Sequence, residues 1–180
     1  GDINDSWESV KDLSQSQLKV QEYNGKGCFN DMAMLVVGMN GRGNVGFKGC
    51  TTEEYRTHFS LWALLNSPLM IGCDIRNMNE STREILLNKD IIAINQDIEC
   101  RGPFCIRQWN NPEKVFALVK PLHGGEYAIG LFNSIINFIQ LLTVNKISNK
   151  VSGSGNNATV DFKVNDKAVQ PGEQLTKAGE

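Results

Sequence analysis

Apolar and polar positions in the first half of the chain follow the pattern of helices that alternate with buried strands. Two short runs, MAMLVVG at 32–38 and PLMIGCD at 68–74, are largely apolar, which favours strands buried on both faces. The spacing and capping signals of the remaining segments predict three helices, at 6–18, 51–67 and 79–97. This order is typical of βα units around a parallel sheet, although two strands do not close one.

Polar residues at the starts of these segments indicate where each helix begins. Asp5 or Ser6 can cap the first helix, and for Asp5 we expect a capping role rather than a catalytic one. The second helix begins with threonines followed by glutamates. The third offers two N-caps, Asn79 and Ser81, and Glu84 has the spacing for a capping box with Ser81.

After about Asp97 the pattern changes to short apolar segments separated by turn residues. The segments CIRQWNN, KVFALVKPL and EYAIGLFN are separated by Asn-Pro and His-Gly-Gly, which is typical of antiparallel hairpins. We therefore predict a small antiparallel β domain over 98–180. Its last part, 135–180, is rich in Gly, Asn and other polar residues, so the pattern specifies its fold only weakly.

Composition excludes some function classes. A net charge of −2 gives no electrostatic basis for binding nucleic acid or an anionic membrane, and no apolar run is long enough to span a bilayer. The first residues do not resemble a signal peptide, so we favour a soluble cytoplasmic protein over a secreted one, although the sequence does not fix the localisation. Five irregularly spaced cysteines suggest neither a disulfide framework nor a zinc site, and we expect no metal and no cofactor.

One glycine-rich motif, GRGNVG at 41–46, matches the spacing of a dinucleotide-binding loop. Such a loop requires the helix to begin at its last glycine, where free N–H groups meet the pyrophosphate. Here the helix is expected to begin near Thr52. We therefore interpret the motif as a long mobile loop on the side of the strands where barrel enzymes bind their substrates.

Carboxylates are the remaining candidates for catalysis. His58 and His123 have no serine or cysteine in a triad-like setting, so we expect packing or surface roles for both. Glycoside hydrolysis needs only a pair of carboxylates. The candidates in the first half of the chain are Asp2, Asp5, Asp31 and Asp74. For Asp74 we favour a structural role, either paired with Arg76 or capping a turn.

Four ordered blocks, GDINDSW, GCFNDMAMLVVG, EEYRTHFSLWALLNSPLMIGCDIRNM and KDIIAINQD, resemble the second half of glycoside hydrolase family 27, the α-galactosidase or melibiase group. The resemblance continues more loosely to about Asn133. It implies that 1–97 is the C-terminal part of a (β/α)8 barrel, with about strands seven and eight and their helices, and that 98–180 is β-sandwich-like. A complete barrel takes about 250 residues.

The resemblance also implies a retaining hydrolase for terminal α-galactosides, in which Asp2 is the general acid/base. The nucleophile of the family would lie upstream of Gly1, so we expect the isolated chain to be inactive. The alternative is a non-catalytic carbohydrate-binding or structural remnant. The open edge of a partial barrel also predicts self-association.

The block FNDMAML departs from the family pattern, which is similar to W-N-D-P-D-M-L. Phe29, Met32 and Ala33 replace its Trp, its Pro and its second Asp. The resemblance makes Asp31 and Met34, which are retained, candidate substrate contacts. Galactose, N-acetylgalactosamine and arabinopyranose all remain compatible with the family.

Overall fold

The computed structural model describes residues 2–106, 115–133, 138–144, 147–152, 159–164 and 167–168. Part of the segment whose fold was weakly specified, 135–180, lies outside these residues. Within them, helices come first along the chain and strands second. None of the helices in the described ranges is long and apolar enough to cross a membrane.

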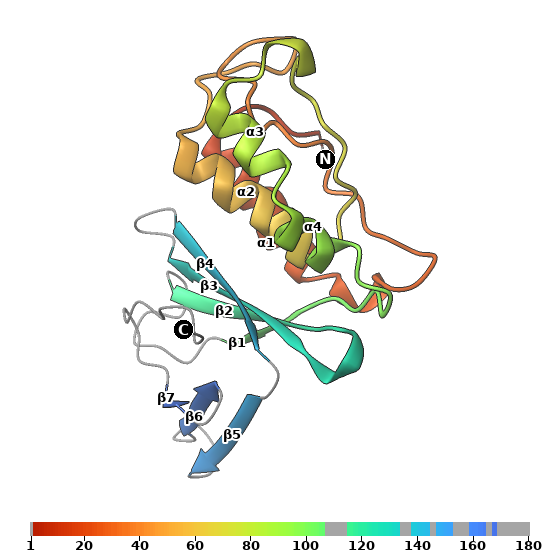
Figure 1. Ribbon diagram of the computed structural model, residues 1–180, viewed down its shortest axis with the longest axis vertical. Coiled ribbons are helices and arrows are strands. Elements are labelled where there is room, and N and C mark those ends of the chain that lie inside the picture. Colours follow the sequence, from red (N-terminus) through yellow and green to blue (C-terminus); the bar gives the residue numbers. More distant parts are fainter. Residues whose placement is uncertain are drawn as a thin grey trace.

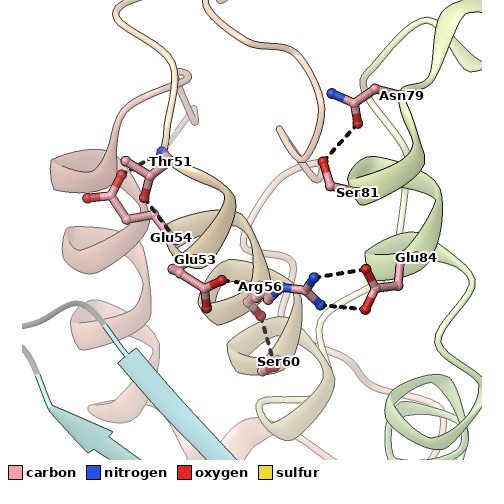
Figure 2. Close-up of polar contacts among 8 residues, drawn as sticks. All are labelled: Thr51, Glu53, Glu54, Arg56, Ser60, Asn79, Ser81 and Glu84. Atoms are coloured by element: carbon pink, nitrogen blue, oxygen red, sulfur yellow. Dashed lines mark hydrogen bonds and ion pairs between the residues drawn. The ribbon is translucent and has the colours of Figure 1, made fainter.

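Two of the predicted helices are confirmed. α1 spans Trp7–Leu18 and α2 spans Thr52–Leu64. Thr51 begins α2 with a capping box, in which its hydroxyl accepts from the Glu54 N–H while the Glu54 carboxylate accepts from the Thr51 N–H (Figure 2). These bonds satisfy two N–H groups that an isolated helix end leaves without partners.

The third predicted helix is instead two shorter ones, α3 at Glu80–Leu86 and α4 at Lys89–Asn95. Asn88 interrupts the helix because its side-chain oxygen accepts from two N–H groups of the next turn and so starts α4. The predicted Ser81 capping box is wrong. Asn79 caps α3, and Glu84 instead pairs with both terminal nitrogens of Arg56 on α2 (Figure 2).

The two predicted buried strands are not strands in the structure. Residues 32–38 and 68–74 meet at a single parallel bridge, Leu35 with Ile71, in which the Leu35 N–H donates to the Met70 carbonyl and its carbonyl accepts from Gly72. Left-handed backbone at Ala33, with φ 71°, and at Gly38, with φ 82°, limits the extended stretch around Leu35. A single bridged residue pair is too short to form a strand pair.

The predicted antiparallel hairpins are confirmed. The first sheet has the order β1-β2-β3-β4, from Phe104–Ile106, Val115–Pro121, Tyr127–Asn133 and Phe138–Val144. A second sheet has the order β5-β6-β7, from Ile147–Ser152, Thr159–Val164 and Lys167–Ala168. Figure 1 shows the helices gathered on one side of the first sheet, and α2 contacts β3 and β4 as well as its neighbouring helices.

One apolar core joins the helices to the first sheet. Trp7 on α1 lies beside Phe132 on β3, with 6.3 Å between ring centroids, and Phe132 in turn packs on Phe116 of β2. Lys120 of β2 is fully buried in this interface. Its ammonium donates to carbonyl or amide oxygens of Ala63, Asn66 and Ile94, so that its three N–H groups meet three acceptors at the ends of α2 and α4.

Candidate active site

The segment that precedes α1 presents one carboxylate to solvent on a fixed backbone. Asp2 is exposed, whereas Ile3 is 3% exposed and belongs to the apolar core. The Asn4 N–H donates to the Ser9 hydroxyl, and the Ser6 hydroxyl donates to the Asn4 side chain while it accepts from the Ser9 N–H as the helix cap. The cap is therefore Ser6.

The prediction that Asp5 caps the helix is wrong. Asp5 is 0% exposed, and its carboxylate accepts from the Tyr55 hydroxyl at 2.8 Å and from the Gly41 N–H at 2.7 Å. Its backbone N–H donates to the Val45 carbonyl, and its own carbonyl accepts from the Gly49 N–H. Asp5 thus holds the loop of residues 41–49, which contains the GRGNVG motif, at three points. The side chain turns away from the start of α1 because this loop supplies partners that burial requires.

The Cys50 thiol also donates to this carboxylate, and both it and the Tyr55 hydroxyl remain protonated at neutral pH. Burial, reinforced by the nearby Asp5 carboxylate, raises the pKa of the Cys50 thiol to about 12, and the thiol hydrogen-bonds to Asp5. Burial is also the main reason that the pKa of Tyr55 is raised above its ordinary value. The Tyr55 hydroxyl accepts from the Asn40 N–H while it donates to Asp5. These donors account for the burial of a carboxylate that forms no ion pair within the described part of the chain.

The GRGNVG loop closes on itself around Asp5. A β-carbon placed on Gly46 would lie 2.7 Å from the Gly41 carbonyl oxygen, and one on Gly49 would lie 2.9 Å from the Gly41 nitrogen. The glycines therefore permit close backbone contacts within the loop, and α2 begins only at Thr52, as expected. The loop is not arranged as a phosphate-binding turn.

A groove of about 610 Å³ lies between this loop and the segment after the Leu35–Ile71 bridge. Asn40 and Arg42 line one side of it, and residues 72–77 line the other. Asp74 lies on that second side, and hydrogen bonds from Arg76 lower its pKa to about 2. The expected pairing of Asp74 with Arg76 is confirmed.

Of the other predicted site residues, Met34 contacts the groove wall. Met34 packs over Gly72, since a β-carbon on that glycine would be 2.7 Å from the Met34 sulfur. Asp31 is exposed, and its carboxylate accepts from the Ala33 N–H at 2.8 Å, in a turn that the Trp62 indole also holds by donating to the Ala33 carbonyl. Met34, Asp2 and Asp31 are not themselves among the residues that line the groove.

Both histidines have the structural roles predicted for them. His58 is fully buried, and its Nε2 accepts from the Val36 N–H at 3.1 Å. His123 is exposed in the turn between β2 and β3, and its Nδ1 lies 3.1 Å from the Glu99 carboxylate. Within the described ranges, no group of three or more His, Cys, Asp or Glu side chains is arranged to hold a metal ion.

Residues 1–97 match the family model described as Alpha galactosidase A, of the melibiase group. The chain belongs to this family. It is 42% identical over 141 residues to alpha-galactosidase 3 of Arabidopsis thaliana, a match that covers 73% of the chain and 28% of that protein.

Among solved structures, the melibiase-family chain is similar to alpha-galactosidase I of Mortierella vinacea, with a TM-score of 0.59 and 26% identity over 79% of this chain and 31% of that one. It is also similar to a GH27 β-L-arabinopyranosidase of Geobacillus stearothermophilus, with a TM-score of 0.63 and 26% identity over 73% and 31%. The chain therefore spans about a third of the length of these relatives.

The role of Asp5 was not predicted from the sequence. Its position directly before a helix favoured capping, and nothing local identified Tyr55 and Gly41, 50 and 36 residues away, as its partners. The one available indication was that Asp5 lies between two apolar residues, Ile3 and Trp7, that proved to be buried. The sequence therefore contained evidence of burial but none of the donors.

Proposed function

We propose that this chain forms part of a retaining glycoside hydrolase that acts on terminal α-galactosides, with Asp2 as its general acid/base. The observation that carries the proposal is the local environment of Asp2 in this chain, which belongs to the melibiase family. Its carboxylate is exposed, while Ile3 and Asp5 of the same segment are buried and fixed. A proton-transfer group needs this combination of access and fixed position.

The reaction requires two carboxylates. In a retaining hydrolase the acid protonates the glycosidic oxygen while a second carboxylate, about 5 to 5.5 Å away, attacks the anomeric carbon. The acid then acts as a base and activates the water that hydrolyses the intermediate. We propose, from the family resemblance, that the nucleophile belongs to a segment with no counterpart among these 180 residues. We therefore propose that this polypeptide by itself is inactive.

The same proposal assigns 1–97 to the last part of a (β/α)8 barrel and 98–180 to a β-sandwich-like domain. The parallel orientation of the Leu35–Ile71 bridge supports the first assignment, and the antiparallel sheets support the second. Met34 and Asp31 are proposed substrate contacts. Met34 is the better supported of the two because it packs over Gly72 at the groove wall.

The test is an assay of two polypeptides with nitrophenyl α-galactoside: this 180-residue chain, and the complete protein that carries the nucleophile-bearing segment. We expect turnover by the complete protein only, and its loss in Asp2→Asn. Asp12→Asn, the same change at an exposed position of α1, is the matched control and should keep activity. Activity of the complete protein that survives Asp2→Asn would refute the assigned role.

A second candidate, carbohydrate binding without catalysis, is favoured by the groove and by Ala33, where the family pattern has a carboxylate. Calorimetry of the 180-residue chain with galactose and melibiose tests it. Saturable binding that Arg42→Ala weakens would support this candidate, because Arg42 is an exposed cation on the groove wall. Binding of neither sugar would exclude it.

A further inference from the structure

Asp5 lies at the centre of a buried polar cluster that joins two parts of the candidate site. Its carboxylate and backbone hold Gly41, Val45 and Gly49 of the loop, and Tyr55 of α2. Asp2 lies three residues before it in the chain, on the same fixed segment. The loop that Asp5 holds also provides one wall of the groove.

From this geometry we propose that Asp5 is a positioning residue for the acid/base Asp2, and that it holds the Asp2 segment and the groove wall in register; the inference rests on the proposed function. Ile3 anchors the segment by apolar burial, which sets no direction, and the hydrogen bonds of Asn4 run only to the start of α1. Hydrogen bonds of Asp5 at 2.7 Å and 2.8 Å to two separate elements fix the direction of the segment.

The groove wall depends on the same carboxylate. Gly41, whose N–H donates to Asp5, lies between Asn40 and Arg42, and both of these line the groove. The Asn40 N–H also donates to the Tyr55 hydroxyl, which donates to Asp5. A displacement of the Asp5 carboxylate therefore moves the Asp2 segment and the groove wall relative to each other.

Asp5→Asn is a conservative variant that breaks this arrangement. It keeps the shape of the side chain but replaces one acceptor oxygen by an NH2 group, and both oxygens of Asp5 face donors, the Tyr55 hydroxyl and the Gly41 N–H. With its NH2 group towards Gly41, the amide sets two donors against each other in a buried site; with its NH2 group towards Tyr55, it removes the closer of the two oxygens to which the Tyr55 hydroxyl donates. Tyr55→Phe is a second variant, which removes one donor and keeps the ring.

The test uses the complete protein and two substrates that differ in their need for an acid. Melibiose has a sugar leaving group that must be protonated, whereas the leaving group of 2,4-dinitrophenyl α-galactoside departs without protonation. Because general acid catalysis contributes about 10²- to 10⁴-fold, we expect Asp5→Asn to lower kcat/KM for melibiose roughly 100-fold. For the aryl substrate we expect less than about a tenfold loss, because its glycosidic bond breaks without the acid.

Tyr55→Phe should show the same difference between substrates with a smaller loss, and Asp12→Asn should show none. Equal losses on both substrates would mean that Asp5 only maintains the fold, and no loss would mean that it has no role; either result would overturn the inference while the proposed function stands. If the wild-type protein turns over neither substrate, the proposed function fails and this inference fails with it.

Discussion

The buried imidazole of His58 predicts that this protein loses stability in mild acid. His58 is 0% exposed and packs edge-on against Trp62, with ring centroids 4.0 Å apart. Its Nε2 accepts from the Val36 N–H, so the neutral ring carries its proton on Nδ1, for which no acceptor is found among the described residues. A second proton on Nε2 would break the bond to Val36.

The size of the effect follows from the pKa difference between the folded and unfolded chains. Burial lowers the pKa of His58 from 6.5 to about 3. Between these values the unfolded chain binds a proton that the folded chain does not, so stability falls as the pH falls. A pH of 5 is about 1.5 units below the pKa of the imidazole in the unfolded chain. Protonation of the unfolded chain therefore lowers the free energy of unfolding by about 2 kcal/mol relative to pH 8.

The assay is urea unfolding at pH 8 and pH 5, followed by tryptophan fluorescence, of wild type and His58→Gln. Glutamine offers an acceptor to Val36 and does not titrate. We expect the variant to be less stable at pH 8, because contact with Trp62 is lost, and the difference from wild type to shrink by about 2 kcal/mol at pH 5.

The comparison between variants removes the contributions of acidic groups that both proteins share. His123→Gln, which replaces the other histidine of the chain at an exposed turn, is the control and should leave the acid-dependent loss in place. A difference between wild type and His58→Gln that is the same at both pH values would refute the claim that His58 is buried and neutral.

Four further predictions follow from single positions. Ala33→Gly should raise the free energy of unfolding by about 1 kcal/mol, because Ala33 has φ 71° and left-handed backbone strains any residue with a β-carbon; urea unfolding measures it. Lys120→Met should cost about 3 kcal/mol or more, because the buried Asn66 side-chain oxygen and Ile94 carbonyl lose the donor that Lys120 gives them, and the Ala63 carbonyl keeps the Asn66 N–H. Burial lowers the pKa of Lys120 to about 8, so wild type should also gain stability from pH 8 towards 10.5, a gain that unfolding of the variant should lack. Thr51→Ala should cost about 1 kcal/mol in thermal unfolding through loss of the capping box. If the chain self-associates through the edge beside the Leu35–Ile71 bridge, Ile71→Lys should lower the weight-average mass in sedimentation equilibrium.

Matched variants test the reasons given for these effects. Ala93→Gly, at an exposed position inside α4, should destabilise the chain by about 1 kcal/mol, opposite in sign to Ala33→Gly. Thr51→Ser keeps the capping oxygen and should remain close to wild type. Ile98→Lys, at a more exposed isoleucine away from the bridge, should leave association unchanged. A monomeric wild type would contradict the association proposal directly.

Local sequence patterns predicted the secondary structure correctly where the interactions that stabilise it are also local. The starts of α1 and α2 and the hairpins after Asp97 were predicted because caps, helical spacing and turn residues act over a few positions. The same reasoning failed for 79–97, where the Asn88 side chain starts a new helix, and for the two apolar runs, whose strands would need neighbours that a local pattern does not reveal.

The sequence by itself determined the starts of α1 and α2, the antiparallel hairpins and the family, and it suggested the proposed role of Asp2. Only the tertiary structure decided that Asp5 is a buried link between two loops and a helix, and that Lys120 joins the sheet to the ends of α2 and α4. The physical reason is the same for both residues. A buried polar group is stable only if it has partners, and the partners of these two come from positions 26 to 57 residues away in the chain.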